Sequence, residues 1–136
     1  MSKYVYSIIG FLVLVGIAWL VITPGKPSLY DAFAKCIKAK QTVTFFGAFW
    51  CPHCQAEKAR FGKSAQYLPY VECSTPDGQG QTQICIANGI TTYPTWQFAT
   101  GTTALATTTY RHVGEMELVD LAQATGCELP QSTTTN

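Results

Sequence analysis

The chain has few charged residues: Asp, Glu, Lys and Arg make up 12% of its 136 residues, about half the usual share. It carries nine basic and eight acidic residues, and no cluster of Lys or Arg occurs along it. Proteins that bind nucleic acids depend on such basic patches. The lack of one excludes an electrostatic basis for nucleic-acid binding. The composition also excludes collagen, coiled coils and wholesale disorder.

The N-terminal part of the chain lacks charge altogether, because no Asp, Glu, Lys or Arg occurs from Tyr4 to Gly25. As a helix, the apolar run from Tyr4 to Ile22 would be about 28 Å long, close to the ~30 Å hydrocarbon core of a membrane. Tyr and Trp near the ends of the run suit the headgroup level. We therefore predict a single transmembrane helix at residues 1–23. A cleaved signal peptide and a buried core helix are the alternatives.

The rest of the chain is long enough for one compact core. We expect a linker at 24–29, a globular domain at 30–130 and a polar tail at 131–136. Within the domain, Ser28 is expected to cap a first helix, with Asp31 three residues later. Hydrophobic periodicity and turn residues then predict an α/β order of elements: strand 42–46, helix 52–61, strand 68–73, a short helix at 81–88, strand 95–98, a hairpin turn at 100–102, a strand before His112 and helix 115–124.

Six cysteines in so short a chain, an even number, favour an oxidising compartment with paired thiols. Cys73 and Cys85 flank a Gly-rich loop, and we expect them to form a disulfide that closes it; a second redox pair that relays electrons is the alternative. Cys36 falls on the buried face of the first helix, and Cys127 follows the last helix. If those helices meet on one side of the sheet, these cysteines pair; the alternative is two buried free thiols.

The side of the membrane is predicted from two signals that disagree. Lysines after the apolar run weakly favour a cytoplasmic domain. Structural disulfides persist outside the cytoplasm, and a folded domain crosses the membrane largely regardless of its charges. The cysteines therefore place the C-terminal domain on the extracytoplasmic side.

The remaining two cysteines form the motif Cys51-Pro52-His53-Cys54, between a predicted strand and a predicted helix. At a helix N-terminus, unpaired backbone N–H groups and the positive end of the helix dipole favour the thiolate of Cys51. The two intervening residues bring Cys54 within reach of Cys51, and a protonated His53 adds positive charge nearby. Thiol–disulfide exchange needs such a pair, one thiol to attack and the other to resolve the mixed disulfide.

Two other interpretations of the motif are weaker. Half of a zinc site would need two more ligands, and the chain has no second C-x-x-C. A redox-inert disulfide is also possible, but the strand before the motif and the aromatic Trp50 favour redox chemistry. We therefore expect neither a metal nor a bound cofactor.

The order of elements and several motifs resemble the thioredoxin superfamily, and the C-P-H-C tetrapeptide resembles that of DsbA-like oxidases. The resemblance is greatest to the thioredoxin-like domains associated with bacterial vitamin K epoxide reductase homologues, and it covers roughly residues 33–130. The segments that carry it are Phe46–Cys54, Tyr70–Cys73, Cys85, Gly89–Ile90 and Tyr93–Trp96.

The resemblance implies a thioredoxin-like fold, with a central mixed sheet flanked by helices, and a cis proline at Pro94 beside the active cysteines, with Tyr93, Trp50 and Pro52 in support. It also implies a thiol–disulfide oxidoreductase acting on cysteine-containing exported proteins and passing electrons to a vitamin K epoxide reductase-like, quinone-linked membrane protein. A disulfide reductase or isomerase, and a redox-inert binding module tethered to the membrane, are the alternatives.

The chain departs from the superfamily pattern at Phe45. Thioredoxin and DsbA-like proteins carry a buried acid six positions before the first active-site cysteine, where this chain has Phe45. Proton transfer to and from Cys54 then requires water or another group, and Glu57 on the same helix is a candidate.

Overall fold

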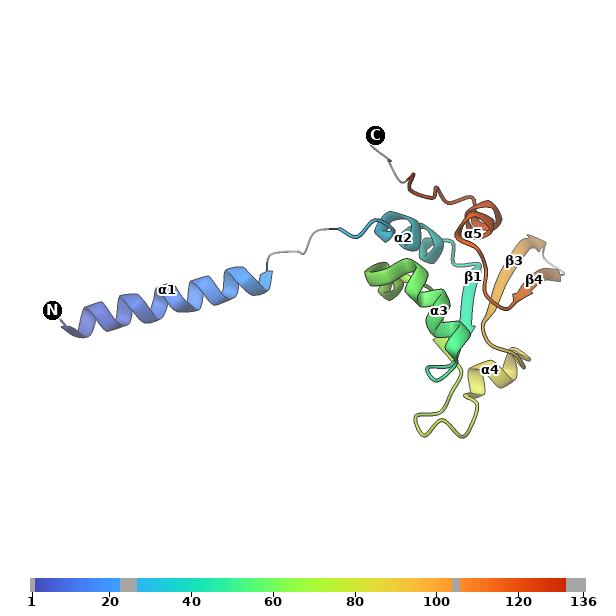
Figure 1. Ribbon diagram of the computed structural model, residues 1–136, viewed down its shortest axis with the longest axis horizontal. Coiled ribbons are helices and arrows are strands. Elements are labelled where there is room, and N and C mark those ends of the chain that lie inside the picture. Colours follow the sequence, from blue (N-terminus) through green and yellow to red (C-terminus); the bar gives the residue numbers. More distant parts are fainter. Residues whose placement is uncertain (1, 23–26, 104–105, 132–136) are drawn as a thin grey trace.

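The computed structural model describes residues 2–22, 27–103 and 106–131, shown in Figure 1. A long N-terminal helix precedes a globular part in which helices surround one sheet. The elements are α1 (Ser2–Ile22), α2 (Asp31–Ala39), β1 (Val43–Gly47), α3 (Pro52–Phe61), the 3-10 helix η1 (Gly62–Tyr67), β2 (Tyr70–Glu72), α4 (Gln83–Ala87), β3 (Thr95–Thr103), β4 (Ala106–Val113) and α5 (Leu118–Thr125).

The uncharged N-terminal run forms the single helix α1, which lies apart from the globular part in Figure 1. The side chains described in it, at residues 4–16 and 18, are all exposed. Across the described residues, however, the structure contains no helix both long and apolar enough to cross a membrane. The finding therefore does not support the predicted membrane anchor.

The sheet has four strands in the order β2-β1-β3-β4. Strand β1 runs parallel to β2 and antiparallel to β3, and β4 pairs antiparallel with β3. A parallel pair needs a crossover connection, and here α3 and η1 connect β1 to β2. The sheet is therefore mixed and flanked by helices, in the α/β, thioredoxin-like arrangement that the sequence predicts.

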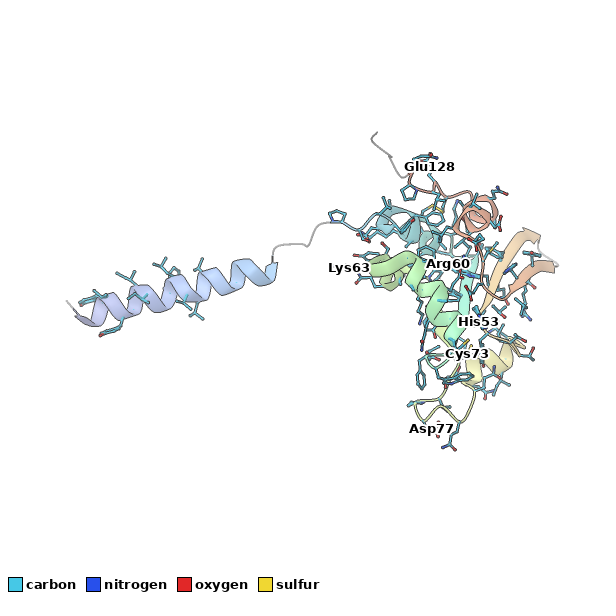
Figure 2. The ribbon with its side chains drawn as sticks, in the orientation of Figure 1. His53, Arg60, Lys63, Cys73, Asp77 and Glu128 are labelled. Carbon is cyan, nitrogen blue, oxygen red and sulfur yellow. A yellow bond between two sulfur atoms is a disulfide. The ribbon has the colours of Figure 1, made fainter. Side chains whose placement is uncertain are left out.

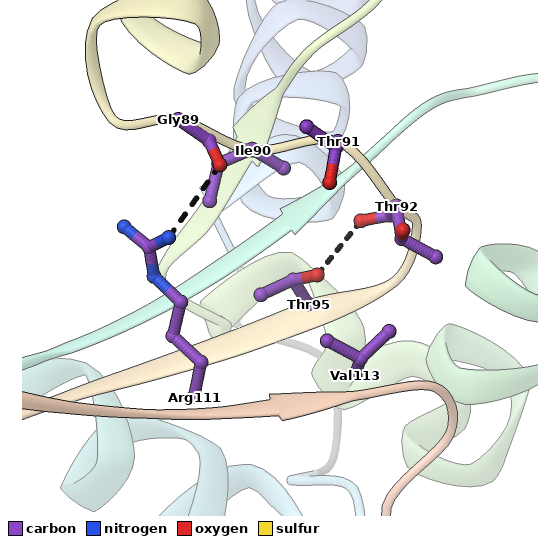
Figure 3. Close-up of a pocket in the computed structure, with 7 residues that line it drawn as sticks. All are labelled: Gly89, Ile90, Thr91, Thr92, Thr95, Arg111 and Val113. Carbon is purple, nitrogen blue, oxygen red and sulfur yellow. Dashed lines mark hydrogen bonds between the residues drawn. The ribbon is translucent and has the colours of Figure 1, made fainter.

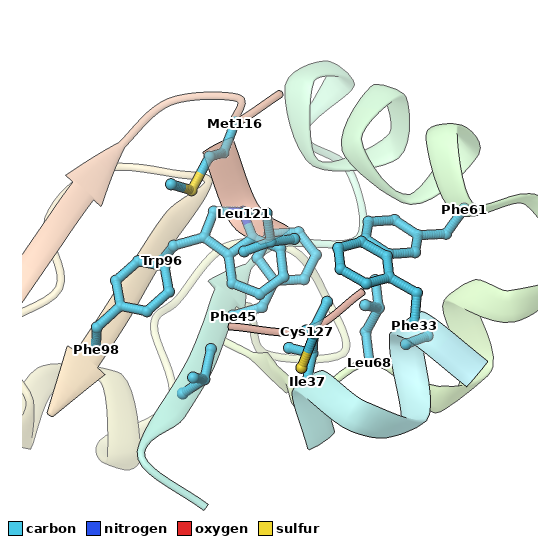
Figure 4. Close-up of a cluster of buried hydrophobic side chains, with 12 residues drawn as sticks. Phe33, Ile37, Phe45, Phe61, Leu68, Trp96, Phe98, Met116, Leu121 and Cys127 are labelled. Carbon is cyan, nitrogen blue, oxygen red and sulfur yellow. The ribbon is translucent and has the colours of Figure 1, made fainter. Parts of the chain in front are cut away.

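Alternation along β1 divides the core between the two faces of the sheet. Phe45 points into the larger cluster, where its ring stacks on Trp96 with centroids 4.5 Å apart. Helices α2, α3 and α5 cover this face with Phe33, Phe61 and Leu121 (Figure 4). Phe46 points to the opposite face, into a smaller cluster with Ile90, Cys73 and Cys85.

Four cysteines form two disulfides. Cys36 of α2 pairs with Cys127, which follows α5, and their Cα atoms are 5.9 Å apart. Cys73 pairs with Cys85 of α4, with Cα atoms 5.5 Å apart; Cys73 is labelled in Figure 2. The structure thus shows the pairing that we expected from the sequence rather than free buried thiols at these positions. Both cysteines of the second pair are fully buried.

The structure corrects three local predictions. Helix α2 begins at Asp31 with Tyr30 at its N-cap, so Ser28 does not cap it; instead the Ser28 backbone N–H donates to the Asp31 carboxylate. The predicted turn at 100–102 lies inside β3, which continues to Thr103. The last helix begins at Leu118, three residues after the predicted start, with Glu117 at its N-cap. Residues 24–26 of the predicted linker and 132–136 of the predicted tail lie outside the described residues.

Candidate active site

Cys51 occupies the N-cap position of α3 and Pro52 the first helical position, where a missing N–H costs nothing. Helix α3 runs to Phe61 and ends at Gly62, whose φ of 55° suits a residue without a side chain. These are the bounds predicted from the sequence. The Cys51 side chain is 5% exposed, and its Sγ lies 3.7 Å from the carbonyl oxygen of Tyr93. The N-terminus of α3 offers unpaired backbone N–H groups of the kind that favour a thiolate, and the Tyr93 carbonyl can accept a hydrogen bond from the thiol.

Cys54 lies one turn into the same helix and is fully buried. Both Cys51 and Cys54 are present as free thiols. The pKa of Cys54 is raised to about 12, chiefly by burial and also by hydrogen bonding and charge at Cys51. At neutral pH the Cys54 thiol therefore keeps its proton, and of the two sulfur-bearing residues only Cys51, at 5% against 0%, retains any exposed area. The geometry thus assigns the attack on a disulfide to Cys51 and its resolution to Cys54.

Pro94 and Tyr93 border the active cysteines from the loop before β3. The Tyr93–Pro94 peptide bond is cis, and Pro94 is buried. Trp50 packs edge-on against Tyr93, with ring centroids 6.1 Å apart. The Trp50 indole donates to Ser74 Oγ at 2.8 Å, and Gln81 donates to the Tyr93 hydroxyl at 2.6 Å. The residues expected to support the site therefore surround Cys51, and they are linked to the loop that the Cys73–Cys85 disulfide closes.

His53 contacts the segment between β4 and α5. Its Nδ1 lies 2.7 Å from Glu115 Oε1, and Arg60 donates to the other oxygen of Glu115 at 2.9 Å. Arg60 also pairs with Glu117 at 2.7 Å. The hydrogen bond from His53 lowers the pKa of Glu115. Figure 2 labels His53 and Arg60 on α3. Glu115, expected from the sequence in the first turn of the last helix, instead pairs with His53.

The buried acid of the site comes from α3 rather than from β1. Phe45 is fully buried and stacked on Trp96, so no carboxylate stands at its position. Glu57 is also fully buried, and its two oxygens accept hydrogen bonds from Trp96 Nε1 and the Met116 backbone N–H, both at 3.0 Å. Burial raises the pKa of Glu57. Both oxygens thus accept hydrogen bonds from β3 and from the segment before α5, and a role of Glu57 in proton transfer to Cys54 stays a prediction.

Glu72, which sequence analysis missed, ties the C-x-x-C loop to β2. Its Oε1 accepts the backbone N–H of Phe49 at 3.1 Å and that of Ser74 at 2.9 Å. Its Oε2 accepts the Tyr70 hydroxyl at 2.8 Å. One carboxylate thereby connects the backbone just before Cys51 to β2 and to the residue after Cys73.

Two hollows lie near the loop that contains Pro94. The larger, of about 410 Å³, opens beside Trp50 and is lined by Gly78, Gln79, Gly80, Gln81, Ile90, Thr91 and Tyr93. The smaller, of about 50 Å³, lies between that loop and β4 and is shown in Figure 3. There Arg111 donates to the carbonyl of Gly89 and Thr95 to that of Thr92. It has room for a few water molecules, whereas the larger hollow has room for side chains of a peptide.

Within the part of the chain that the structure describes, no group of three or more His, Cys, Asp or Glu side chains is arranged to hold a metal ion. The thiols of Cys51 and Cys54 thus stand beside each other without the further ligands that a zinc site needs. What the arrangement can do chemically is exchange a disulfide.

Comparison with known proteins agrees with this chemistry. The pattern of the Thioredoxin family matches residues 27–124. Among curated proteins, the chain is similar to Thiol-disulfide oxidoreductase LTO1 of Arabidopsis thaliana, with 40% identity over 96 residues. The aligned region covers 67% of this chain but only 23% of that relative.

Proposed function

This chain belongs to the thioredoxin family, and from that membership we propose that it is a thiol–disulfide oxidoreductase that forms disulfides in exported proteins. The observation that carries the proposal is the contrast between two thiols on one helix. Cys51 stands at the N-terminus of α3, where a thiolate is favoured, and Cys54 is buried with its pKa raised to about 12.

The reaction proceeds by two exchanges. A substrate thiolate attacks Sγ of Cys51 in the oxidised enzyme, the Cys51–Cys54 bond breaks, and Cys54 leaves with the electron pair as a thiolate that then takes a proton from water. A second substrate thiolate attacks the substrate sulfur of the mixed disulfide and releases Cys51 as a thiolate. The substrate loses two electrons, and the enzyme pair gains them. The hollow beside Trp50 offers room for the peptide around the substrate cysteine.

Oxidation rather than reduction is the proposed direction, because a stabilised Cys51 thiolate stabilises the reduced enzyme. A more stable reduced form means a more oxidising couple. The helix terminus and the nearby imidazole of His53 both act in this sense.

We further propose that the domain acts on the extracytoplasmic side, anchored by α1. The two stapling disulfides support an oxidising compartment. The sequence supports the anchor, because the run from Tyr4 to Gly25 contains no Asp, Glu, Lys or Arg. A vitamin K epoxide reductase-like membrane protein that uses quinone is the proposed electron acceptor. This partner is suggested by the resemblance of the C-P-H-C motif and its flanking segments.

Trapping of the mixed disulfide tests the proposed chemistry. With Cys54→Ala, a reduced, unfolded secretory protein such as ribonuclease should remain bound to Cys51 through a disulfide once the variant is activated with an aromatic disulfide. With Cys51→Ala no such adduct should form. Non-reducing gels and mass spectrometry identify the linked cysteine. Turnover that survives Cys51→Ala would refute the assignment of the nucleophile.

A further inference from the structure

Cys54, the leaving thiol of the reaction, is buried close to the aromatic ring of Tyr70. Cys54 is fully buried against Gly47 of β1. A Cβ added at Gly47 would lie 2.9 Å from Cys54 Sγ and 2.9 Å from Cε2 of Tyr70. The sulfur and the Tyr70 ring therefore approach the same point, and only a glycine in β1 leaves room for both.

The ammonium group of Lys58 lies over the face of the Tyr70 ring, which borders the Cys54 sulfur. The ammonium of Lys58 lies 3.2 Å from the centroid of the Tyr70 ring. Lys58 follows Cys54 by four residues on α3, so the two side chains lie on the same side of the helix. The Tyr70 hydroxyl donates to Glu72, which holds the ring in place. Cation–π contact of this kind is strongest where water is partly excluded.

We propose that Lys58, held over the Tyr70 ring, is the cation that stabilises the Cys54 thiolate when the Cys51–Cys54 disulfide opens and when Cys54 resolves a mixed disulfide. The inference rests on the proposed thiol–disulfide exchange and adds a charge-supplying residue to it. Without such a charge, release of a thiolate into a buried site is costly, since burial disfavours the charged form.

The charged groups around Cys54 support this assignment. Cys51, at the N-cap of α3, and Lys58 on α3 act on Cys54, Tyr70 borders it from β2, and Glu72 acts on Lys58 and Tyr70. Burial dominates and raises the pKa of Cys54, Cys51 raises it further, and among the side chains Lys58 is the one that lowers it. Burial lowers the pKa of Lys58, while the charges of Glu72 and Cys54 raise it. An ammonium at Lys58 and a thiolate at Cys54 therefore favour each other.

The presence of Lys58 does not change the electron balance of the thiol–disulfide exchange. In resolution, Cys54 loses its proton to water and attacks Cys51 Sγ; the new Cys51–Cys54 bond forms, and the bond to the bound thiol breaks. The departing thiolate carries away the electron pair. Lys58 exchanges no atoms in this step, and its positive charge lowers the energy of the Cys54 thiolate that attacks.

The experiment uses the reduced chain and follows the reactions of its two thiols, which occur one after the other. A chromogenic aromatic disulfide releases one coloured thiolate when Cys51 attacks it, and a second when Cys54 resolves the adduct. Lys58→Met keeps the length of the side chain and removes the charge. We expect it to slow the second phase about tenfold, as for a rise of one unit in the pKa of Cys54, and to leave the first phase unchanged. The pH at which the second phase levels off should shift upward.

Lys58→Arg should recover much of the second phase, because it restores the positive charge. Lys63→Met, at an exposed position on η1 labelled in Figure 2, is the matched control and should behave as the wild type. Should Lys58→Met fail to fold, Lys58→Gln carries the same expectation. A second phase that is unchanged in the uncharged variant, or no faster in Lys58→Arg, overturns the inference. A wild-type protein without any Cys51 phase would instead refute the proposed function.

Discussion

The imidazole of His53 pairs with the carboxylate of Glu115, with Nδ1 and Oε1 2.7 Å apart. Glu115 comes from the segment between β4 and α5, 62 residues further along the chain. Arg60, two turns along α3 from His53, donates to the other oxygen of Glu115. The histidine beside the active cysteines is therefore part of a charged network that connects α3 to the end of the sheet.

Replacement of His53 tests what this network does to the redox couple. His53→Ala removes positive charge near Cys51, so the reduced form should become less stable and the reduction potential more negative. Glu115→Gln combined with His53→Ala should add little, because Glu115 acts on the cysteines through His53. Lys38→Ala, a charge change at an exposed position of α2, is the control. Equilibration with glutathione buffers measures each potential; an unchanged potential in His53→Ala would refute the role of the imidazole.

The buried carboxyl group of Glu57 should contribute to the free energy of unfolding by an amount that depends on pH. Glu57→Ala leaves the buried N–H groups of Trp96 and Met116 without acceptors, and should lower the free energy of unfolding by about 2–4 kcal/mol. Because the folded protein raises the pKa of Glu57 above its ordinary 4.5, the folded state binds this proton more tightly, and the stabilising contribution of Glu57 declines as pH rises through the raised value. The loss in Glu57→Ala should therefore be larger below about pH 4.5 than at neutral pH. Urea unfolding at both pH values measures it, and a loss that grows with pH would contradict this account.

The two disulfides should contribute unequally to stability. Cys36 and Cys127 are 91 residues apart in sequence, and Cys73 and Cys85 only 12. In the chain-entropy account, removal of the first bond by paired Ala substitutions costs about 4–5 kcal/mol and removal of the second about 3 kcal/mol. Chemical denaturation of the oxidised variants gives both values. The reverse order would show that strain or residual structure outweighs loop length.

Deletion of residues 1–24 tests the proposed anchor. The described side chains of α1 are exposed, so the shortened protein should stay folded and should still form the mixed disulfide at Cys51. It should no longer float with phosphatidylcholine vesicles, whereas the full chain should. Circular dichroism and flotation measure the two properties. An unfolded deletion variant would place the segment in the core. A full chain that does not float with the vesicles would contradict the anchor.

Local signals in the sequence predicted the parts of the fold that depend on neighbouring residues. Pro52 and Gly62 mark both ends of α3 because each has a conformational reason to stand there. The turn at 100–102 was wrong, because β-branched threonines on either side of Gly101 allow β3 to continue when β4 pairs with it. Glu115 was assigned to a helix since acidic residues suit a first turn.

The candidate active site likewise contains residues that the sequence identifies and contacts that only the folded chain creates. Cys51, Cys54 and Pro94 could be named from the sequence, since the first two are spaced for exchange and the third lies in a motif shared with the thioredoxin superfamily. The contacts of Lys58 with Tyr70 and of His53 with Glu115 join elements far apart in the chain. Neither pair has a spacing that local periodicity could detect, because the packing of the sheet brings them together.

Redox titration of the full chain tests whether Cys51 and Cys54 form an oxidising couple. The protein is equilibrated with glutathione buffers, its free thiols are alkylated, and mass spectrometry identifies the pairing of each cysteine. The account predicts that only Cys51 and Cys54 interconvert, with a potential above about −220 mV, between thioredoxin at about −270 mV and DsbA at about −120 mV. A potential near −270 mV would contradict the oxidase assignment in favour of a reductase, and a disulfide from Cys51 or Cys54 to any other cysteine of the native chain would contradict the site itself.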